Sequence, residues 1–294
     1  MNKGICFAGG GIKCVSHVGV IKAFEEENIK FDYISGTSSG SIIAVLYALG
    51  YTSKEMYELI RKYSKEINYV EYQKIIKLFF DIIILKKIKI DGLNSGKKLE
   101  KIIQKICSEK NVKKFTDINK KILIPSVDLC DGKLYIFNSL KNEDNKKRNY
   151  IDTIVYDNNI EIWKAVRASC SYPGIFCPYK YKDTKLVDGG IRENVPWREL
   201  KNSGADEVLC ITFSDRIKKS CNKNIFSVIS DSIEILCHEL SIYELQGVEN
   251  RINIEVQNVE LLDNKKIDYL YEKGYLSAKK YLKEYKRRNN VINE

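Results

Sequence analysis

Short apolar runs alternate with stretches of helical periodicity along most of the chain. A short apolar run that ends at glycine, serine or aspartate is typical of a buried strand. We predict strands on this basis at residues 4–8, 30–35, 121–128, 133–137, 185–187, 207–213 and 252–256. The Asp131-Gly132 pair is a turn signal between two of these segments.

Apolar residues at helical spacing predict helices at residues 15–24, 160–168 and 267–285. Residues 41–49 are apolar nearly all round, so we expect a buried helix there that ends at Gly50. Thr52 or Ser53 is a suitable N-cap for the helix that follows.

One more helix is predicted at residues 226–246, and its orientation is inferred from the spacing of its apolar residues. Four of them recur at steps of three or four, as on one helix face: Ile229, Ile233, Leu236 and Leu240. We expect this stripe to face the core. His238 then lies roughly 200° away from the stripe, which predicts a surface position.

Predicted strands and helices alternate throughout, which indicates an α/β protein whose mostly parallel sheet is covered on both faces. The chain has 294 residues, without an internal repeat or a clear linker, and its 4 prolines are too few for a proline-rich one. Residues 141–149 are predicted to be an exposed loop. We therefore expect a single domain over residues 1–294.

The segment Gly36-Thr37-Ser38-Ser39-Gly40 follows a predicted strand and precedes the buried helix. This is the setting of a nucleophile elbow, where a tight turn exposes the Ser38 hydroxyl and the glycines avoid collisions. The N-terminus of the helix adds positive potential near a developing oxyanion. The alternative is that Ser38 is only an N-cap in a glycine-rich turn.

A second glycine-rich segment, Gly9-Gly10-Gly11-Ile12-Lys13, also lies between a strand and a helix. Its consecutive glycines let backbone N–H groups converge on an anion, as in an oxyanion hole. A purely structural turn is one alternative.

Dinucleotide binding is the other alternative for this loop. It needs the pattern G-x-G-x-x-G, and Cys14 stands where the third glycine belongs. Asp32 does lie at a suitable distance along the chain for a ribose contact. The missing glycine counts against a non-enzymatic nucleotide-binding module, which would also leave the elbow unexplained.

The third motif, Asp188-Gly189-Gly190, stands at the end of a predicted strand. An aspartate there can act as a base toward a serine, although the segment by itself would be an ordinary turn.

Taken together, the three motifs resemble those of the patatin-like phospholipases. The resemblance covers about residues 4–214 and extends to Arg167-Ala168-Ser169-Cys170-Ser171-Tyr172-Pro173, Phe176, Pro178 and Asn194-Val195-Pro196.

The resemblance implies a three-layer α/β/α sandwich that hydrolyses acyl esters of lipids with a Ser–Asp dyad and no histidine. It implies phospholipid or another acyl-ester lipid as substrate, and neither a metal nor a cofactor. Residues 215–294 would complete the domain with helices and a strand. Cys14 departs from the family, which usually has glycine after the basic residue of the first motif.

Carried over to this chain, the resemblance makes Ser38 the nucleophile and Asp188 the base. The oxyanion hole would be formed by backbone N–H groups of the loop that contains Gly9, Gly10, Gly11 and Ile12. Gly36 and Gly40 would shape the elbow. Lys13 would support the glycine loop, and Gly189 and Gly190 would support the Asp188 motif.

An α/β-hydrolase triad of Ser38, Asp188 and His238 has a permitted chain order. However, Ser38 comes too early, because the strands and the oxyanion loop before such a serine need more than 37 residues. His17, the other of only 2 histidines, falls in the first helix. This shortage also argues against a histidine-rich metal site.

The positive charge of the chain is concentrated in residues 61–121. They contain 17 basic and 7 acidic residues, which accounts for the whole formal charge of +10. Such a region suits an anionic membrane or nucleic acid, with a solvated lysine-rich surface as the alternative. Neither zinc-ligand spacing nor an RNA-binding motif supports nucleic acid, so we expect no nucleic-acid partner.

Residues 75–85 are the candidate membrane-facing helix within this region. The segment is apolar, carries flanking lysines and is too short to span a bilayer. The alternative is a core helix with a lysine fringe. We expect peripheral contact with an anionic membrane surface.

The 9 cysteines have no regular spacing, and the N-terminus lacks an apolar region of signal-peptide length. Both observations favour free thiols in a reducing compartment, and hence a cytoplasmic location.

Overall fold

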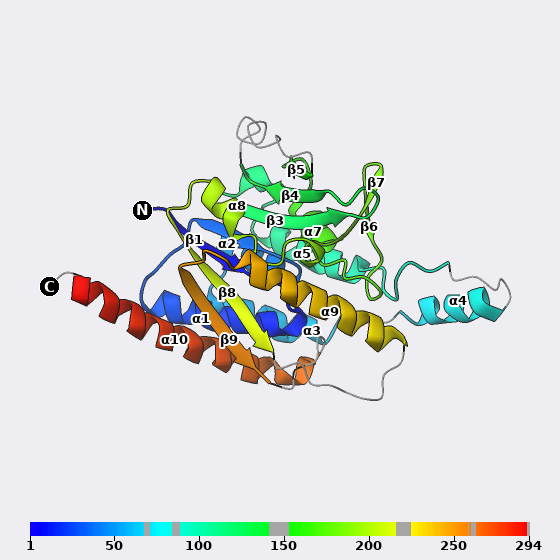
Figure 1. Ribbon diagram of the computed structural model, residues 1–294. Coiled ribbons are helices and arrows are strands. Elements are labelled where there is room, and N and C mark those ends of the chain that lie inside the picture. Colours follow the sequence, from blue (N-terminus) through cyan, green and yellow to red (C-terminus); the bar gives the residue numbers. More distant parts are fainter. Residues whose placement is uncertain are drawn as a thin grey trace.

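The computed structural model describes residues 1–67, 71–83, 89–140, 153–215, 225–257, 259 and 263–292. Its strands form one sheet with the order β5-β4-β3-β2-β1-β8-β9, and β7 joins it through β3 and also pairs with β6 (Figure 1). The strands are β1 (Lys3–Phe7), β2 (Tyr33–Gly36), β3 (Lys121–Asp128), β4 (Leu134–Asn138), β5 (Ile154–Asp157), β6 (Tyr179–Tyr181), β7 (Thr184–Asp188), β8 (Glu207–Asp215) and β9 (Asn250–Val256).

The centre of the sheet is parallel. β1 pairs in parallel with β2 and β8, β2 with β3, and β8 with β9. β3 runs antiparallel to β4 and to β7. Because β1 and β2 run in the same direction, with Phe7 opposite Gly36, the glycine loop and the elbow emerge side by side at one edge of the sheet.

Helices cover both faces of this sheet. Along β1, Ile5 and Phe7 belong to one hydrophobic cluster, whereas Cys6 and Ala8 belong to another on the opposite face. This confirms the expected three-layer α/β/α architecture. The helices are α1 (Val15–Glu26), α2 (Ser39–Ala48), α3 (Ser53–Ser64), α4 (Tyr72–Ile83), α5 (Lys97–Glu109), α7 (Ile162–Ser169), α8 (Trp197–Asn202), α9 (Ile225–Glu244) and α10 (Ile267–Ile292), with 3₁₀ turns η1 (Gly11–Cys14), η2 (Phe115–Asp117), η3 (Gly189–Ile191) and η4 (Asn264–Lys266).

The predicted strands and helices are present, with ends shifted by a few residues. α2 stops before Gly50, which has a φ of +80°, and Thr52 caps α3 in a reciprocal capping box with Glu55. Strands β5 and β6 and helices α5 and α8 were not predicted. The loop expected at 141–149 lies outside the described residues, as does the end of segment 75–85.

The orientation predicted for α9 is wrong. Ile229 is 51% exposed and Leu236 is 68% exposed, whereas Ile233 and Leu240 are half-buried, so none of the four residues of the expected core stripe is buried. His238 is half-buried and lines a cavity together with Ser241. The apolar spacing correctly predicts a helix with one apolar face. In the structure, the more polar face of α9 lines the cavity, and the apolar face is not packed in the core.

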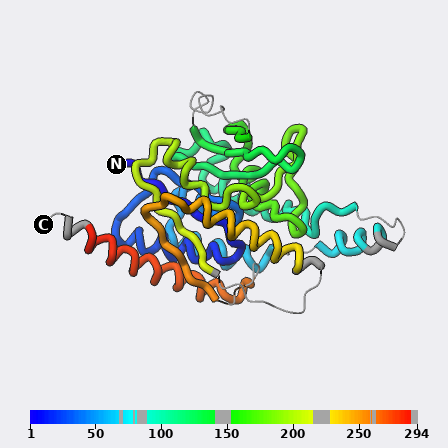
Figure 2. Tube along the Cα trace, viewed as in Figure 1, coloured from blue at the N-terminus to red at the C-terminus, as the bar shows by residue number. Residues whose placement is uncertain are grey.

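Helices α1 and α10 pack closely side by side (Figure 2). Two glycines, Gly19 and Gly274, allow this close approach. A Cβ atom on Gly19 would lie 2.0 Å from the carbonyl oxygen of Tyr271. A Cβ atom on Gly274 would lie 1.8 Å from the carbonyl oxygen of Ser16. Backbone atoms fill both spaces, so a side chain at either position would push the helices apart.

Gly274→Ala should therefore destabilise the protein, although alanine is the better helix former. We expect a loss of about 1–3 kcal/mol, as for other overpacked sites, measured by urea unfolding. Leu276→Ala, on the same helix at a side chain that is 54% exposed, is the control and should stay within about 0.5 kcal/mol. Equal stability of the two variants would show that the helices can separate without loss.

Candidate active site

Ser38 stands in the turn between β2 and α2, as the sequence predicts. Its backbone has a φ of 52° and a ψ of −130°, a conformation that is strained for a residue with a side chain. The N–H of Ser38 donates to Ser169 Oγ at 3.0 Å, and Ser41 Oγ donates to the Ser38 carbonyl. The turn thus projects the Ser38 side chain away from the start of the helix.

The two glycines of the elbow are required by close packing of backbone on backbone. A Cβ on Gly36 would lie 2.4 Å from the carbonyl oxygen of Gly40. A Cβ on Gly40 would lie 2.4 Å from the carbonyl oxygen of Phe7, the last residue of β1. The elbow is therefore pressed directly against the strand that leads into the glycine loop.

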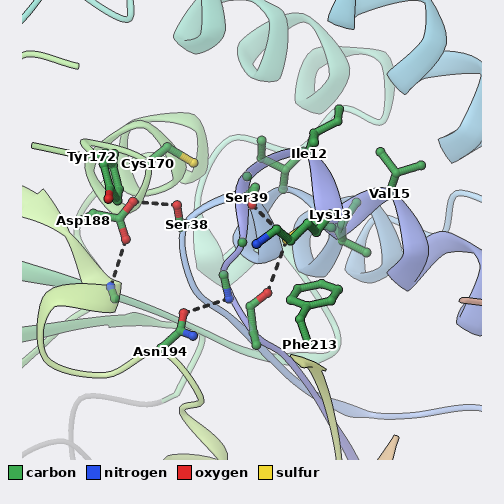
Figure 3. A pocket seen from close by; sticks show the side chains of 18 of the residues that line it. Ile12, Lys13, Val15, Ser38, Ser39, Cys170, Tyr172, Asp188, Asn194 and Phe213 are labelled. Atoms are coloured by element: carbon green, nitrogen blue, oxygen red, sulfur yellow. Dashed lines mark hydrogen bonds between the residues drawn. The ribbon is translucent and has the colours of Figure 1, made fainter. Parts of the chain in front are cut away.

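Asp188 meets Ser38 although 150 residues separate them in sequence. Ser38 Oγ donates to Asp188 Oδ2 at 2.6 Å, and the Gly190 N–H donates to Asp188 Oδ1 at 2.9 Å (Figure 3). Asp188 is 2% exposed, and burial raises the pKa of its carboxyl to about 7, against the lowering effect of these two hydrogen bonds. A buried carboxylate in this position can accept a proton from the serine.

The glycine loop lies against the elbow. A Cβ on Gly9 would be 3.1 Å from Ser38 Cβ, and the Gly9 N–H donates to Asn194 Oδ1 at 3.0 Å. This hydrogen bond occupies the Gly9 N–H group, which is therefore not available to bind a substrate oxygen. Gly10, Gly11 and Ile12 also line the cavity beside Ser38.

Asn194 is part of the site in the structure, although the sequence pattern does not indicate this role. It stands in the Asn-Val-Pro segment that supported the resemblance, and its amide Nδ2 donates to Ser241 Oγ of α9 at 3.1 Å. Asn194 thus ties the glycine loop to the helix above the cavity.

Lys13 and Cys14 fix the far side of the loop. Lys13 is 4% exposed, and its Nζ lies 3.3 Å from Glu234 Oε1 on α9. Cys14 Sγ accepts from Ser39 Oγ at 2.8 Å and donates to the Ala8 carbonyl at 3.3 Å. Burial raises the pKa of the Cys14 thiol to about 12, which keeps it protonated. The cysteine that departs from the family pattern therefore bridges the two motifs.

Neither histidine forms a hydrogen bond with Ser38 or Asp188. His17 is fully buried between the rings of Phe7 and Phe213, with Nε2 2.9 Å from the Ala8 carbonyl. Burial lowers the pKa of His17 to about 4, so the ring is neutral at pH 7. Among the described residues, His238 lines the cavity without a hydrogen bond to either group. A Ser–His–Asp relay does not match this arrangement.

The dinucleotide alternative fails on the position of Asp32. This residue precedes β2, and its N–H donates to the Lys3 carbonyl at the first residue of β1. The glycine loop follows the last residue of the same strand, so the two lie roughly 20 Å apart at opposite edges of the sheet. Asp32 is also exposed and pairs with Lys120 at 3.4 Å.

The cavity around Ser38 has a volume of about 300 Å³. Its walls come from η1, α2, α3, α5 and α9 and from the ends of β8 and β9. Within the described residues, no cluster of histidine, cysteine or carboxylate side chains could hold a metal ion. None of the described helices is both long and apolar enough to cross a bilayer.

The strain at Ser38 makes a testable prediction about stability. Ser38→Ala and Ser38→Gly both remove the hydroxyl, but only glycine adopts a positive φ without strain. We expect Ser38→Gly to be about 1 kcal/mol more stable than Ser38→Ala in urea unfolding, since the relief exceeds the entropy cost of glycine. If the alanine variant is the more stable one, the elbow is not strained.

The chain matches a family model and several known proteins. The model described as patatin-like phospholipase matches residues 5–201. YqhO, an uncharacterized protein of Bacillus subtilis, is 30% identical over 230 residues, with 74% of each chain covered. The lysophospholipase NTE1 of Meyerozyma guilliermondii is 26% identical over 302 residues, covering 94% of this chain but 19% of that protein. The chain thus spans about a fifth of the length of this relative.

Among solved structures, VipD from Legionella pneumophila has the same fold. The TM-score is 0.51 at 15% sequence identity, and the match covers 96% of this chain and 67% of that chain. The match of the family model over most of the chain agrees with the three motifs that the structure brings together. The chain therefore belongs to the patatin-like phospholipase family and is a hydrolase of ester bonds.

Proposed function

We propose that the protein cleaves fatty-acyl esters of membrane lipids through an acyl-enzyme on Ser38, with Asp188 as the base. The observation that carries this proposal is the 2.6 Å hydrogen bond from Ser38 Oγ to Asp188 Oδ2 at the wall of a largely apolar cavity. A serine becomes an effective nucleophile only when a base within hydrogen-bond reach takes its proton.

In the first half of the reaction, Ser38 Oγ attacks the ester carbonyl carbon while its proton moves to Asp188 Oδ2. The carbonyl oxygen becomes an oxyanion, and collapse of this intermediate breaks the bond to the leaving alcohol. Asp188 returns the proton to the departing oxygen. An acyl-enzyme remains, and Asp188 is again ionised.

In the second half, a water molecule occupies the place of the leaving group. Asp188 accepts a proton from this water as the oxygen attacks the acyl carbon. The fatty acid leaves when the bond to Ser38 Oγ breaks, and the proton passes from Asp188 to the serine. Ser38 and Asp188 return to their initial states.

The oxyanion would be bound by backbone N–H groups of Gly10, Gly11 and Ile12. The Gly9 N–H is excluded from this set, because it donates to Asn194. The N-terminus of α2, which begins at Ser39, adds positive potential on the same side of the carbonyl. Preorganised donors of this kind stabilise the charge that develops in the transition state.

Lipid substrates are supported by the lining of the cavity and by the relatives. α2, α3 and α5 contribute mainly isoleucine and leucine side chains to the cavity wall. Burial of aliphatic carbon there is favourable, by about 25 cal/mol per Å². The relative from Meyerozyma guilliermondii is named a lysophospholipase, which makes lysophospholipids the first substrates to test.

Three variants test the assignment of the nucleophile and the base. With a soluble short-chain ester, Ser38→Ala and Asp188→Asn should each lose about 10⁴-fold in kcat, and Ser38→Ala should no longer react with a fluorophosphonate probe. His238→Ala should change kcat by less than about threefold, or ~0.7 kcal/mol. An active Asp188→Asn beside an inactive His238→Ala would contradict the proposal.

The pH profile is a second readout of the same assignment. Asp188 must be ionised to accept the serine proton, and burial raises its pKa to about 7. The kcat/KM of the wild-type enzyme should therefore rise as the pH increases through about 7 and then level off. A rise centred near 4, the ordinary value for aspartate, would point to a different base.

We further propose that α4 contacts an anionic lipid surface. Figure 1 shows α4 projecting from the body of the protein. Tyr72, Ile76 and Phe80, spaced four residues apart on one helix face, are 76%, 54% and 54% exposed, so this face is not core. Lys77 is exposed on the same helix. Exposed apolar residues beside lysine suit insertion among acidic headgroups.

The double variant Ile76→Asp/Phe80→Asp should bind vesicles containing phosphatidylserine at least tenfold more weakly than the wild type, because it removes apolar area and adds negative charge. Co-sedimentation at low and high salt would measure this, and wild-type binding should fall as salt rises. Leu276→Asp is the matched control, since Leu276 on α10 is also 54% exposed. Equal binding by all three proteins would show that the membrane is reached elsewhere.

A further inference from the structure

The cavity is chemically different on the two sides of Ser38. α2, α3 and α5 line one side, and no residue that they contribute within the described part of the chain is charged. The lining contributed by α9 and the residue that follows it, and by β8 and β9, is mixed: it contains Phe213, Ile242 and Leu245, and it also carries polar and charged side chains. These include Thr212, Glu234, His238, Ser241 and Arg251.

The apolar side extends away from the nucleophile along α2. Ser38 immediately precedes this helix, and Ile42 and Leu46 follow at the next two turns of the same face. At 1.5 Å per residue, these positions lie about 6 Å and about 12 Å from Ser38 along the helix axis. Ile60 of α3 and Ile103 of α5 line the same space from the facing helices.

This space suits an aliphatic chain and little else. A headgroup with charges would lose its hydration there without a charged partner, which is strongly unfavourable. Methylene groups gain about 0.8 kcal/mol each on leaving water. The polar side could instead accommodate the alcohol half of the ester, where Arg251 donates to Thr212 Oγ1 at 2.8 Å at the cavity wall.

We propose that the space between α2, α3 and α5, here called the acyl arm, binds the fatty-acyl chain, and that its depth along α2 sets the chain-length preference. This inference rests on the proposed function. The ester carbonyl lies at Ser38, the acyl chain points along α2 toward Leu46, and the polar leaving group stays beneath α9. Ile42 and Leu46 are the specificity-determining positions.

Tryptophan substitutions along α2 test the acyl arm. The kcat/KM is measured for p-nitrophenyl esters from acetyl to palmitoyl, below their micelle concentrations. Leu46→Trp fills the deep end, so the ratio of long-chain to butyryl hydrolysis should fall at least tenfold. Ile42→Trp blocks the arm one turn earlier, so the loss should begin at shorter chains.

Leu236→Trp is the matched control. Leu236 is 68% exposed on the outer face of α9, outside the cavity, so this variant should keep the wild-type profile. Leu46 is only 2% exposed, so the Leu46→Trp variant can fail to fold. Two further variants therefore test the same prediction. Ile60→Trp, at a half-buried side chain, should lose long-chain activity, and Leu46→Ala should shift the optimum toward longer chains.

The outcomes separate the two proposals. If neither short nor long esters are hydrolysed in a Ser38-dependent way, the proposed function fails. If esters are hydrolysed but the chain-length profiles of the α2 and α3 variants run parallel to that of Leu236→Trp, the acyl arm is wrong. The order of the cut-offs, shorter for Ile42→Trp than for Leu46→Trp, is required by the direction of the arm.

Discussion

The burial of the Asp188 carboxyl is the constraint on which the arrangement of the site depends. An aspartate that is almost inaccessible to water resists ionisation, and the donors in contact with it, Ser38 Oγ and the Gly190 N–H, limit that penalty. The same burial raises the pKa of Asp188 toward neutrality, which suits a general base. β7 pairs with β3 so that Asp188 lies opposite Ser126, and this pairing holds Asp188 in place beside Ser38.

A second constraint couples the elbow to the glycine loop. Gly40 packs on the Phe7 carbonyl, and Gly9 packs between Ser38 and Asn194, so neither turn can shift without the other. Ser39 and Cys14 add a side-chain contact between the same two segments. The nucleophile and the oxyanion donors of the proposed mechanism therefore belong to one closely packed unit at the carboxyl ends of the parallel strands.

α9 has a different relation to the site, because it covers the cavity rather than the sheet. Its inner face is tied down by polar contacts, in which the Asn194 and Val195 N–H groups donate to Glu244 and Lys13 pairs with Glu234. Its outer face leaves large apolar side chains in solvent. α9 therefore contributes the polar side chains Glu234, His238 and Ser241 to the wall of the cavity, away from the acyl arm.

The sequence by itself determined the strand–turn–helix setting of Ser38, the glycine loop and the Asp188 turn, because glycine patterns and short apolar runs reflect local backbone constraints. It also determined the layered α/β class, since alternating strands and helices leave few other ways to bury a parallel sheet. The pairing of Asp188 with Ser38 followed from the resemblance of the motifs, and the tertiary structure supplied the contact between them. Only the tertiary structure decided that Asn194 occupies the Gly9 amide and that α9 leaves Ile229 and Leu236 of its apolar stripe exposed. These contacts depend on long-range packing. The periodicity of a sequence shows that a helix has an apolar and a polar face, but it does not show which part of the protein each face contacts.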